Sequence, residues 1–210
     1  MYLIGASGHG KVIAEILLPQ FPQLRVLDSD PTLVGSSFLD RRVEDEETTL
    51  ESLDRSQPFF VSIGEAADRR TVATRWEAHG HQLVTAIHES AVVSPSAQVA
   101  PGACVMARAV LQAESRVGRG AIVNTAATID HDTMLGDFVH IAPGAHLSGN
   151  VAVGSDSWIG VGAIVKEGIQ IAPRVLVGAG SVVVEDLPEN IVAYGNPCRI
   201  VRSRDSVSAQ

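Results

Sequence analysis

The chain has 210 residues, of which 45% are hydrophobic, 19% charged and only 4% aromatic, and its formal net charge is −8. This composition is that of a globular protein rather than a disordered one, and the length suits one large domain or two small ones. The acidic balance argues against nucleic acid as the main partner, although it leaves room for a local phosphate site.

The chain begins directly with an apolar segment, Tyr2 to Ile4, with no signal-like region before it. No apolar run approaches the length of a membrane span. The two cysteines, Cys104 and Cys198, form no CxxC pair, so neither a disulfide framework nor a structural zinc site is expected. These features predict a cytoplasmic protein without membrane insertion.

The first part of the chain alternates between short strands and helices. Strands are expected at residues 2–4, 25–27, 59–63 and 82–87, and helices at 12–18 and 67–78. The polar, acidic stretch 31–58 is expected to be loop with one short helix. Strands and helices joined by short turns predict a small parallel sheet of the Rossmann type.

A glycine-rich turn, GASGHGK at residues 5–11, joins the first strand to the first helix. Its glycine spacing is GxxGxG rather than the dinucleotide pattern GxGxxG. A glycine turn at a helix start offers backbone N–H groups to a phosphate, and the acid Asp28 ends the second strand, where such sheets hold a ribose or a base. We favour a ligand site over the alternative of a tight turn alone, because both features stand at carboxyl ends of strands.

A repeat of six residues runs through the second half of the chain, from about residue 91 to residue 186. Val, Ile or Leu stands at every sixth position from Val93 to Val183, and a second set of mostly small residues stands two positions before each. Residues two apart on a strand point the same way, whereas a helix needs a period near 3.6. The pattern predicts a parallel β-helix in which each unit of six is a short strand plus a corner.

Three such units, about eighteen residues, should close one triangular coil, and the coils should stack about 4.8 Å apart. Glycines are expected to permit positive φ at the corners, namely Gly118, Gly136, Gly154, Gly160 and Gly178. The repeat carries no loop insertion that could form an internal pocket. Function is therefore expected on an outer face, between the subunits of a ring.

Short motifs extend over nearly the whole chain: GASGHGKV at 5–12, LDSD at 27–30, SIG at 62–64, IHESAVVSPSA at 87–97, NTAATIDHD at 124–132 and YGNPCR at 194–199. With the repeat, they make the chain resemble the bacterial nucleotide-sugar acetyltransferases related to sialic acid O-acetyltransferase and the UDP-4-amino-sugar N-acetyltransferases. The resemblance implies a left-handed β-helix, although right-handed crossovers are the general rule. It also implies a homotrimer that uses acetyl-CoA as co-substrate and needs no metal.

The resemblance further implies a division of labour along the chain. Residues 1–88 would form the Rossmann-like domain that binds a nucleotide-sugar, and residues 89–202 the β-helix with a C-terminal segment, along which acetyl-CoA lies. Residues 203–210 would form a flexible tail. The implied activity is transfer of an acetyl group from acetyl-CoA to the amine of a nucleotide-linked 4-amino-4,6-dideoxy sugar, as in polysaccharide biosynthesis.

Individual residues follow from the same resemblance. The family's contacts to the sugar-nucleotide match Ser7, Gly8, His9, Asp28 and Ser29, and Gly64 ends the third strand on the same rim. Its contacts to acetyl-CoA match His140, Val161 and Ala179.

Acetyl transfer to an amine requires a base near pH 7, and histidine is best suited to this task. Of the seven histidines, His131 stands between two acids, Asp130 and Asp132, and the register places it at a corner. A carboxylate beside a histidine fixes its tautomer and raises its basicity. The family's catalytic base matches His131 and the supporting acid matches Asp132, where relatives can carry the longer Glu.

Three alternatives remain open at this point. A β-helix zinc enzyme would need three histidines, which His131, His140 and His146 supply in number but at spacings that are not multiples of a coil. A non-catalytic sugar-nucleotide-binding module would leave the acid-flanked His131 without a role. O-acetylation of a sialic acid or another sugar hydroxyl is the third, and the residues alone do not separate it from N-acetylation.

Overall fold

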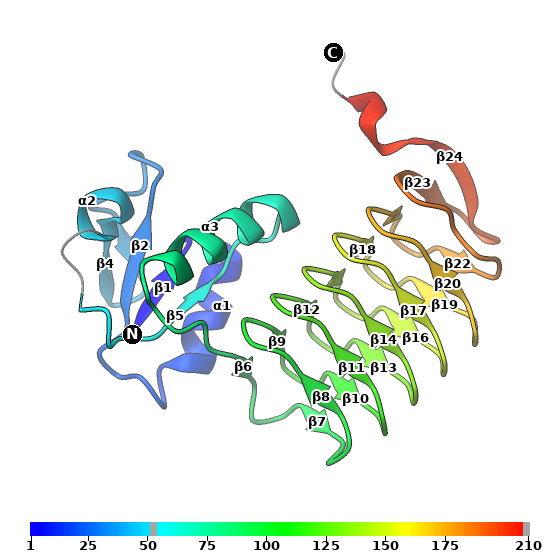
Figure 1. Cartoon of the computed structure of the whole chain (residues 1–210), viewed down its shortest axis with the longest axis horizontal. Coiled ribbons are helices and arrows are strands. Elements are labelled where there is room, and N and C mark those ends of the chain that lie inside the picture. Colours follow the sequence, from blue (N-terminus) through cyan, green and yellow to red (C-terminus); the bar gives the residue numbers. More distant parts are fainter. Residues whose placement is uncertain (51–53, 208–210) are drawn as a thin grey trace. The chain divides into compact units, whose positions relative to one another are not determined.

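The computed structural model of the chain describes residues 1–50 and 54–207. The chain forms two compact units, Met1–Ala86 and Ile87–Gln210 (Figure 1). Within the described residues, no helix is long and apolar enough to cross a bilayer.

The first unit contains a five-stranded mixed sheet in the order β3-β4-β2-β1-β5. Its strands are β1 (Tyr2–Ile4), β2 (Arg25–Asp28), β3 (Ser37–Phe38), β4 (Arg41–Asp45) and β5 (Phe59–Val61). Its helices are α1 (Gly8–Leu17), α2 (Glu46–Leu50) and α3 (Ala66–Ala78). All neighbouring strands pair in parallel except β3 and β4, which form an antiparallel hairpin. The carboxyl ends of β1, β2, β4 and β5 therefore share one edge.

Burial explains why these segments form the sheet. Every residue of β1 and of β5 is buried, so both faces of these two strands are covered. Such strands carry continuous apolar runs, which the sequence shows as Tyr-Leu-Ile and Phe-Phe-Val. On the helices, Ile13 and Leu17 of α1 and Trp76 of α3 are buried in the same unit.

The stretch 31–58 contains one short helix, α2, as expected, but the expected loop around it also contains the strands β3 and β4. In the sequence Arg-Arg-Val-Glu-Asp of β4 only Val43 is buried, and it pairs with Val26 of β2. A strand near the edge of a sheet buries few side chains, so the charged residues of β4 gave no sequence signal of a strand. The strand expected at 82–87 was also too long: Leu83 forms an isolated bridge to Phe59, and β6 covers only Ala86–Ile87.

The second unit is a three-sided stack of parallel sheets, typical of a left-handed β-helix, as the repeat predicted. Its sixteen two-residue strands are β7 (Val92–Val93), β8 (Gln98–Val99), β9 (Cys104–Val105), β10 (Val110–Leu111), β11 (Arg116–Val117), β12 (Ile122–Val123), β13 (Thr128–Ile129), β14 (Met134–Leu135), β15 (His140–Ile141), β16 (His146–Leu147), β17 (Ala152–Val153), β18 (Trp158–Ile159), β19 (Ile164–Val165), β20 (Gln170–Ile171), β21 (Leu176–Val177) and β22 (Val182–Val183). Each pairs with a strand eighteen residues away, for example His140 with Trp158. Figure 1 shows the coils stacked in sequence order from β7 to β22.

The interior of the β-helix is filled by the two residue sets of the repeat. From Ala103 onward, the aliphatic residues and the apolar residues two positions before them form one continuous buried cluster, against which the partly buried Ala91, Val93, Ala97 and Val99 pack. The hydroxyls that enter this interior are hydrogen-bonded: Thr133 donates to the carbonyl of Ser148 at 3.0 Å, and Ser157 to that of Ala172 at 3.1 Å. Buried polar groups therefore interrupt the core without remaining unpaired.

The role expected for the corner glycines was wrong. Gly118, Gly136, Gly154, Gly160 and Gly178 are absent from the residues with positive φ. A Cβ at these positions would lie 2.4–2.7 Å from atoms of a neighbouring coil. Glycine is thus needed there for close stacking of the coils. The left-handed conformation occurs two positions after each of these glycines, at Gly120, Phe138 (φ 57°), Asp156, Gly162 and Gly180, and likewise at Asp132 (φ 59°) in the corner of His131.

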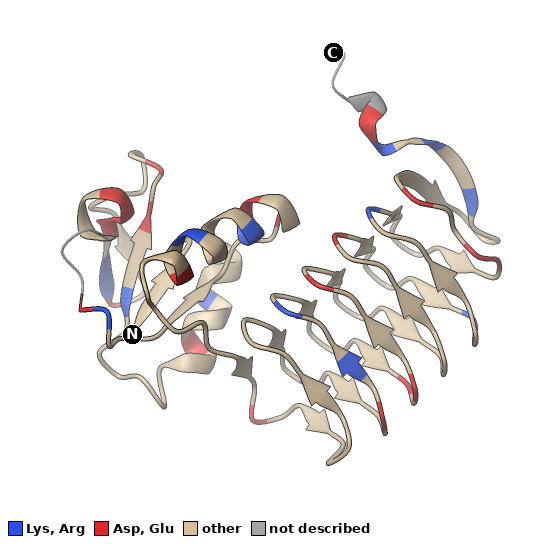
Figure 2. Ribbon diagram, in the orientation of Figure 1, with Lys and Arg blue, Asp and Glu red and all other residues tan. Residues whose placement is uncertain are grey.

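Strands β23 (Ile191–Tyr194) and β24 (Arg199–Ser203) follow the last coil and lead to the 3₁₀ helix η1 (Arg204–Val207). β23 pairs in parallel with β21 and antiparallel with β24, so it extends one of the three sheets. Figure 2 shows that the charged residues of this unit gather mainly along the turns, whereas the strands are largely uncharged. Arg116 is the single charged residue among the outward positions of β7 to β22.

Candidate active site

A cavity of about 220 Å³ lies at the carboxyl edge of the first unit's sheet. Its lining residues are Ile4, Gly5, Ser7, Asp28, Ser29, Glu46, Ile63 and Gly64. Four of the six residues expected to bind the sugar-nucleotide, Ser7, Asp28, Ser29 and Gly64, are therefore gathered around one space. Gly8 and His9 do not line this cavity; they form the first turn of α1.

The turn between β1 and α1 is held in shape by its own residues and by Asp28. Oδ2 of Asp28 accepts a hydrogen bond from the N–H of Ala6 at 2.7 Å, and Oδ1 accepts one from Asp30 at 2.9 Å. A Cβ at Gly10 would lie 2.3 Å from the carbonyl oxygen of Gly5, so the GxxGxG spacing allows α1 to start against the turn. The N-cap residue Ser7 makes no side-chain cap bond, which leaves the N-terminal N–H groups of α1 able to bind an anion.

Glu46 also lines this cavity, although the sequence did not predict it as a site residue. It begins α2, is only 1% exposed, and its Oε1 accepts a hydrogen bond from the indole N–H of Trp76 at 2.6 Å. Arg75 also bonds to Oε1. A buried carboxylate that is fixed by two donors on one oxygen keeps the other oxygen as a potential acceptor for a ligand. Its position in a polar stretch gave no signal of this burial.

Two cationic or titratable side chains lie near the same edge. Arg69 of α3 is buried and donates to the carbonyls of Ile63 at 2.8 Å and Gly64 at 2.7 Å, which fixes the rim after β5. Burial, and then the positive charge of Arg69, lower the pKa of His9 to about 4. His9 is therefore a neutral imidazole at neutral pH.

In the second unit, His131 and Asp132 form a hydrogen-bonded pair at a corner after β13. The distance between Nδ1 of His131 and Oδ2 of Asp132 is 2.8 Å. A carboxylate only accepts, so Nδ1 carries the proton and Nε2 is left with a free lone pair. Hydrogen bonding to Asp132 is the main cause of a raised pKa of His131, and the charges of Asp130, Asp132 and Glu167 act in the same direction. Both side chains are more than half exposed.

His140, expected to contact acetyl-CoA, is a buried residue of β15. Its ring centroid lies 4.0 Å from that of Trp158, and its Nε2 lies 3.1 Å from Nδ2 of Asn124. Trp158 therefore packs on His140 rather than extending freely outward. The contact between Asn124 and His140 was not predicted from the sequence. The contact with an amide fixes the ring of His140 within the sheet.

Val161 and Ala179 are exposed and occupy equivalent corner positions on successive coils, where the N–H of Gly180 donates to the carbonyl of Val161 at 2.8 Å. This corner is not the corner of His131. From Val161 the chain passes along β19 (Ile164–Val165) before it reaches Glu167. Glu167 stands at the same corner as His131, two coils further along the chain. Within one chain, one face of the β-helix therefore separates the candidate base from these two residues.

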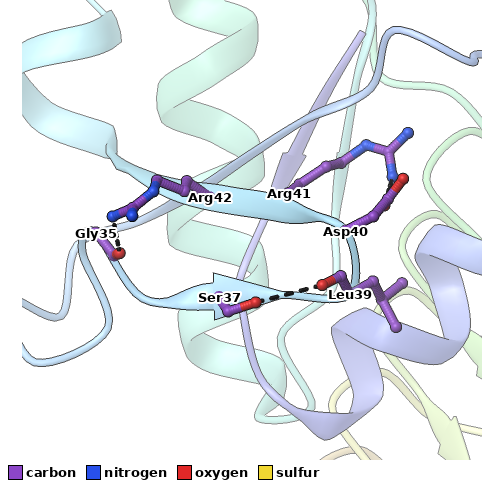
Figure 3. A pocket seen from close by; sticks show the side chains of 6 residues that line it. All are labelled: Gly35, Ser37, Leu39, Asp40, Arg41 and Arg42. Carbon is purple, nitrogen blue, oxygen red and sulfur yellow. Dashed lines mark hydrogen bonds and ion pairs between the residues drawn. The ribbon is translucent and has the colours of Figure 1, made fainter.

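The polar side chains of the β3–β4 hairpin and His146 are bonded to other groups of the chain. In the hollow on the β3–β4 hairpin (Figure 3), Arg41 is bonded to Asp40 and to the carbonyls of Leu24 and Pro22, and Arg42 to the carbonyl of Gly35. His146 bonds to the hydroxyl of Thr128 at 2.8 Å. Over residues 1–50 and 54–207, no three His, Cys, Asp or Glu side chains of the chain converge as a metal site would require.

Known proteins match both units of the chain. Residues 1–76 match the family described as the PglD N-terminal domain. The structure of PerB from Caulobacter crescentus, solved with CoA and GDP-perosamine, is 39% identical, with 95% of this chain and 96% of that chain covered and a TM-score of 0.90. A histidine-to-asparagine variant of the Caulobacter perosamine N-acetyltransferase, with the same ligands, is 38% identical with a TM-score of 0.89 and covers 95% of each chain.

The acetyltransferase domain of PglB from Neisseria gonorrhoeae, solved with acetyl coenzyme A, is 41% identical. The match covers 95% of this chain and 98% of that domain with a TM-score of 0.89. A curated Saccharomyces cerevisiae protein matches at 59% identity over 27 residues only, which are 13% of this chain and 14% of the yeast protein.

A chain with a PglD-type α/β unit followed by a hexapeptide β-helix belongs to the class of hexapeptide-repeat acetyltransferases. More closely, this chain belongs to the PglD family of nucleotide-sugar N-acetyltransferases, of which PerB and the PglB domain are relatives. The expected activity, acetyl-CoA-dependent N-acetylation of a sugar, is thereby confirmed at the level of the family.

Proposed function

We propose that this protein transfers an acetyl group from acetyl-CoA to the amine of a nucleotide-linked 4-amino-4,6-dideoxy sugar, with His131 as general base. The observation that carries the proposal is the His131–Asp132 pair, in which Nε2 of His131 can accept a proton, in a chain that matches sugar N-acetyltransferases over 95% of its length. That variants of a histidine in the Caulobacter enzyme were studied with both ligands bound supports a histidine at the centre of the reaction.

The cavity at the sheet edge is the proposed site for the sugar-nucleotide. The N–H groups at Ser7, Gly8 and His9, where α1 begins, would receive the diphosphate, because a helix N-terminus attracts anions. Asp28 and Ser29 would meet the ribose or base at the end of β2, and Gly64 would lie on the sugar side after β5. Glu46 would add a hydrogen-bond acceptor from β4's side of the same edge.

The proposed reaction is a direct attack on the thioester. The sugar amine forms a bond to the thioester carbonyl carbon while Nε2 of His131 takes a proton from the amine nitrogen. The tetrahedral species then breaks its C–S bond, the amide forms, and the CoA thiolate leaves and receives the proton from His131. Asp132 stabilises the imidazolium that exists between these two steps.

The separation of corners supports a homotrimer with shared sites. His131 stands at one edge of the face formed by β7, β10, β13, β16, β19 and β22, and Val161 and Ala179 stand at its other edge. The outward residues of this face include Thr128 and His146 but no Lys, Arg, Asp or Glu, and Val92 and Ile164 on it are 62% and 46% exposed. A face that is poor in charge and exposes aliphatic side chains is typical of a contact between subunits. We place the acetyl-CoA of each site along His140, Val161 and Ala179 of one subunit and the base on a neighbouring subunit.

The test is a thermal-shift panel of UDP-, GDP- and dTDP-linked 4-amino sugars with and without acetyl-CoA, followed by an assay of CoA release. A ligand that binds the native state raises Tm by mass action, so the true acceptor gives the largest shift. It should also give acetyl transfer with one CoA released per acetamide formed. Release of CoA only with an unlinked sialic acid or a hydroxyl acceptor would overturn the proposal.

A further inference from the structure

Gly149 lies at the same corner of the β-helix as His131, one coil further along the chain. The coils are joined there by backbone bonds: the N–H of Asn150 donates to the carbonyl of His131 at 2.9 Å, and the N–H of Gly168 donates to that of Gly149 at 3.0 Å. Gly149 itself is buried and is not among the residues with positive φ. Its backbone conformation is therefore open to any residue, and does not explain why glycine stands there.

The neighbouring coils show that this corner can hold a side chain. Ala113 occupies the equivalent position one coil before His131, and Glu167 the equivalent position one coil after Gly149. Gly149 thus lacks a side chain at a corner position where the neighbouring coils have one. The reason must be the group that lies against it.

The imidazole of His131 lies directly against the backbone of Gly149. A Cβ at residue 149 would be 2.5 Å from Cε1, 2.6 Å from Nε2 and 3.1 Å from Nδ1 of His131. Ordinary van der Waals contact begins at 3.4 Å, so a single methyl group would displace the ring by about 0.9 Å. The space that the ring occupies exists because residue 149 has no side chain.

We propose that Gly149 is a positioning residue for acetyl transfer, which lets the ring of His131 rest on the next coil in the orientation that bonds Nδ1 to Asp132 and presents Nε2. The proposal rests on the proposed role of His131 as base. Gly149 acts on the ring through the space that its missing side chain leaves open.

The proposal predicts that a Gly149→Ala variant keeps its stability but loses activity. The His131 side chain is 55% exposed and can swing away from a new methyl group, so the β-helix should keep its fold and Tm. The reacting geometry, in contrast, depends on the ring's place, and a shift near 1 Å costs about 100-fold in rate. We expect kcat to fall about 100-fold, with little change in KM for the sugar-nucleotide.

A matched control is Ala113→Gly, which changes the same corner one coil before His131 and keeps the backbone carbonyl that accepts from the N–H of Asp132. It should keep the wild-type kcat.

The readout besides activity is the NMR titration of the His131 Cε1–H. Asp132, Asp130 and Glu167 raise the pKa of His131 in the native chain. In Gly149→Ala the bond to Asp132 is lost, so this pKa should fall toward 6.5. In an Asp132→Asn background, Gly149→Ala should lower kcat by a smaller factor than in the wild type.

A Gly149→Ala variant with wild-type kcat, or one whose His131 titrates as in the wild type while activity falls, would overturn the proposal. The NMR arm needs no turnover. If His131 proves not to be the base, His131→Ala keeps its activity, whereas failure of the positioning role leaves His131→Ala inactive and Gly149→Ala active. The two failures are therefore distinguishable.

Discussion

His131 and Asp132 are neighbours in the sequence, yet their side chains face one another, with 2.8 Å between Nδ1 and Oδ2. The left-handed conformation of Asp132, with φ of 59°, makes this possible, because consecutive side chains of an extended segment would point apart. The N–H of Asp132 is bonded to the carbonyl of Ala113 in the preceding coil at 3.0 Å, which holds that conformation in place.

Replacement of His131 by Ala removes the only proposed base. We expect kcat to fall by about 10²- to 10⁴-fold, the usual contribution of general base catalysis, while binding of the sugar-nucleotide is retained. The measurement is CoA release with a thiol reagent. His79→Ala is the control, since His79 follows α3 in the first unit and neither lines the cavity nor lies on the face proposed for the trimer. Equal losses in both variants would contradict a special role of His131.

Replacement of Asp132 by Asn changes the pH dependence of the reaction. The bond to Asp132 is the largest cause of the raised pKa of His131, so the native enzyme should lose kcat/KM as pH falls through a pKa above 6.5. In Asp132→Asn this acid limb should move to lower pH, and the plateau should fall because the imidazolium loses its carboxylate. Asp130→Asn serves as comparison, and should move the limb less. A profile that stays unchanged in Asp132→Asn would refute this account.

His9 should make the first unit sensitive to acid. Its pKa is about 4 in the folded chain and near 6.5 when unfolded, so the unfolded state binds more protons between these values. Stability should therefore be complete above pH 6.5 and decrease as pH falls toward 4, by up to about 3 kcal/mol. Urea unfolding at pH 7 and pH 5 measures it. In His9→Gln the loss between the two pH values should shrink, and an equal loss would show that other groups cause it.

Glu46 should matter to both folding and substrate binding. Glu46→Gln weakens the bonds to Arg75 and Trp76 and removes the proposed acceptor, so we expect a loss of about 1–3 kcal/mol and a higher KM for the sugar-nucleotide. Glu47→Gln, one residue later and exposed, is the matched control and should do neither. Unfolding curves and initial rates separate the two effects. An unchanged KM would remove Glu46 from the binding site.

The proposed trimer depends on the uncharged face that carries Ile164. Ile164→Asp would place a charge in the contact, and we expect the mass measured by light scattering to fall to that of the monomer together with the activity. Gln170→Asp, also exposed but on the adjacent face, should remain trimeric. A native chain that is monomeric and active would contradict shared sites.

The sequence by itself determined the β-helix, the preceding α/β unit and the family. The reason is that these depend on local patterns: alternation within a strand, a period of six, and motifs at fixed spacing. The same register predicted that His131 stands at a corner beside an acid. Continuous apolar runs likewise revealed β1 and β5, whereas β4 escaped because it buries only Val43.

Only the tertiary structure decided which residues share a site. Glu46 joins the cavity because β4 pairs with β2, and Asp28 turns both carboxylate oxygens toward backbone N–H groups. Gly149 faces His131 because three corners bring residues eighteen apart into contact, which depends on the closure of a coil and on its stacking. A six-residue period says which way a side chain points; the contacts between coils determine what it meets there.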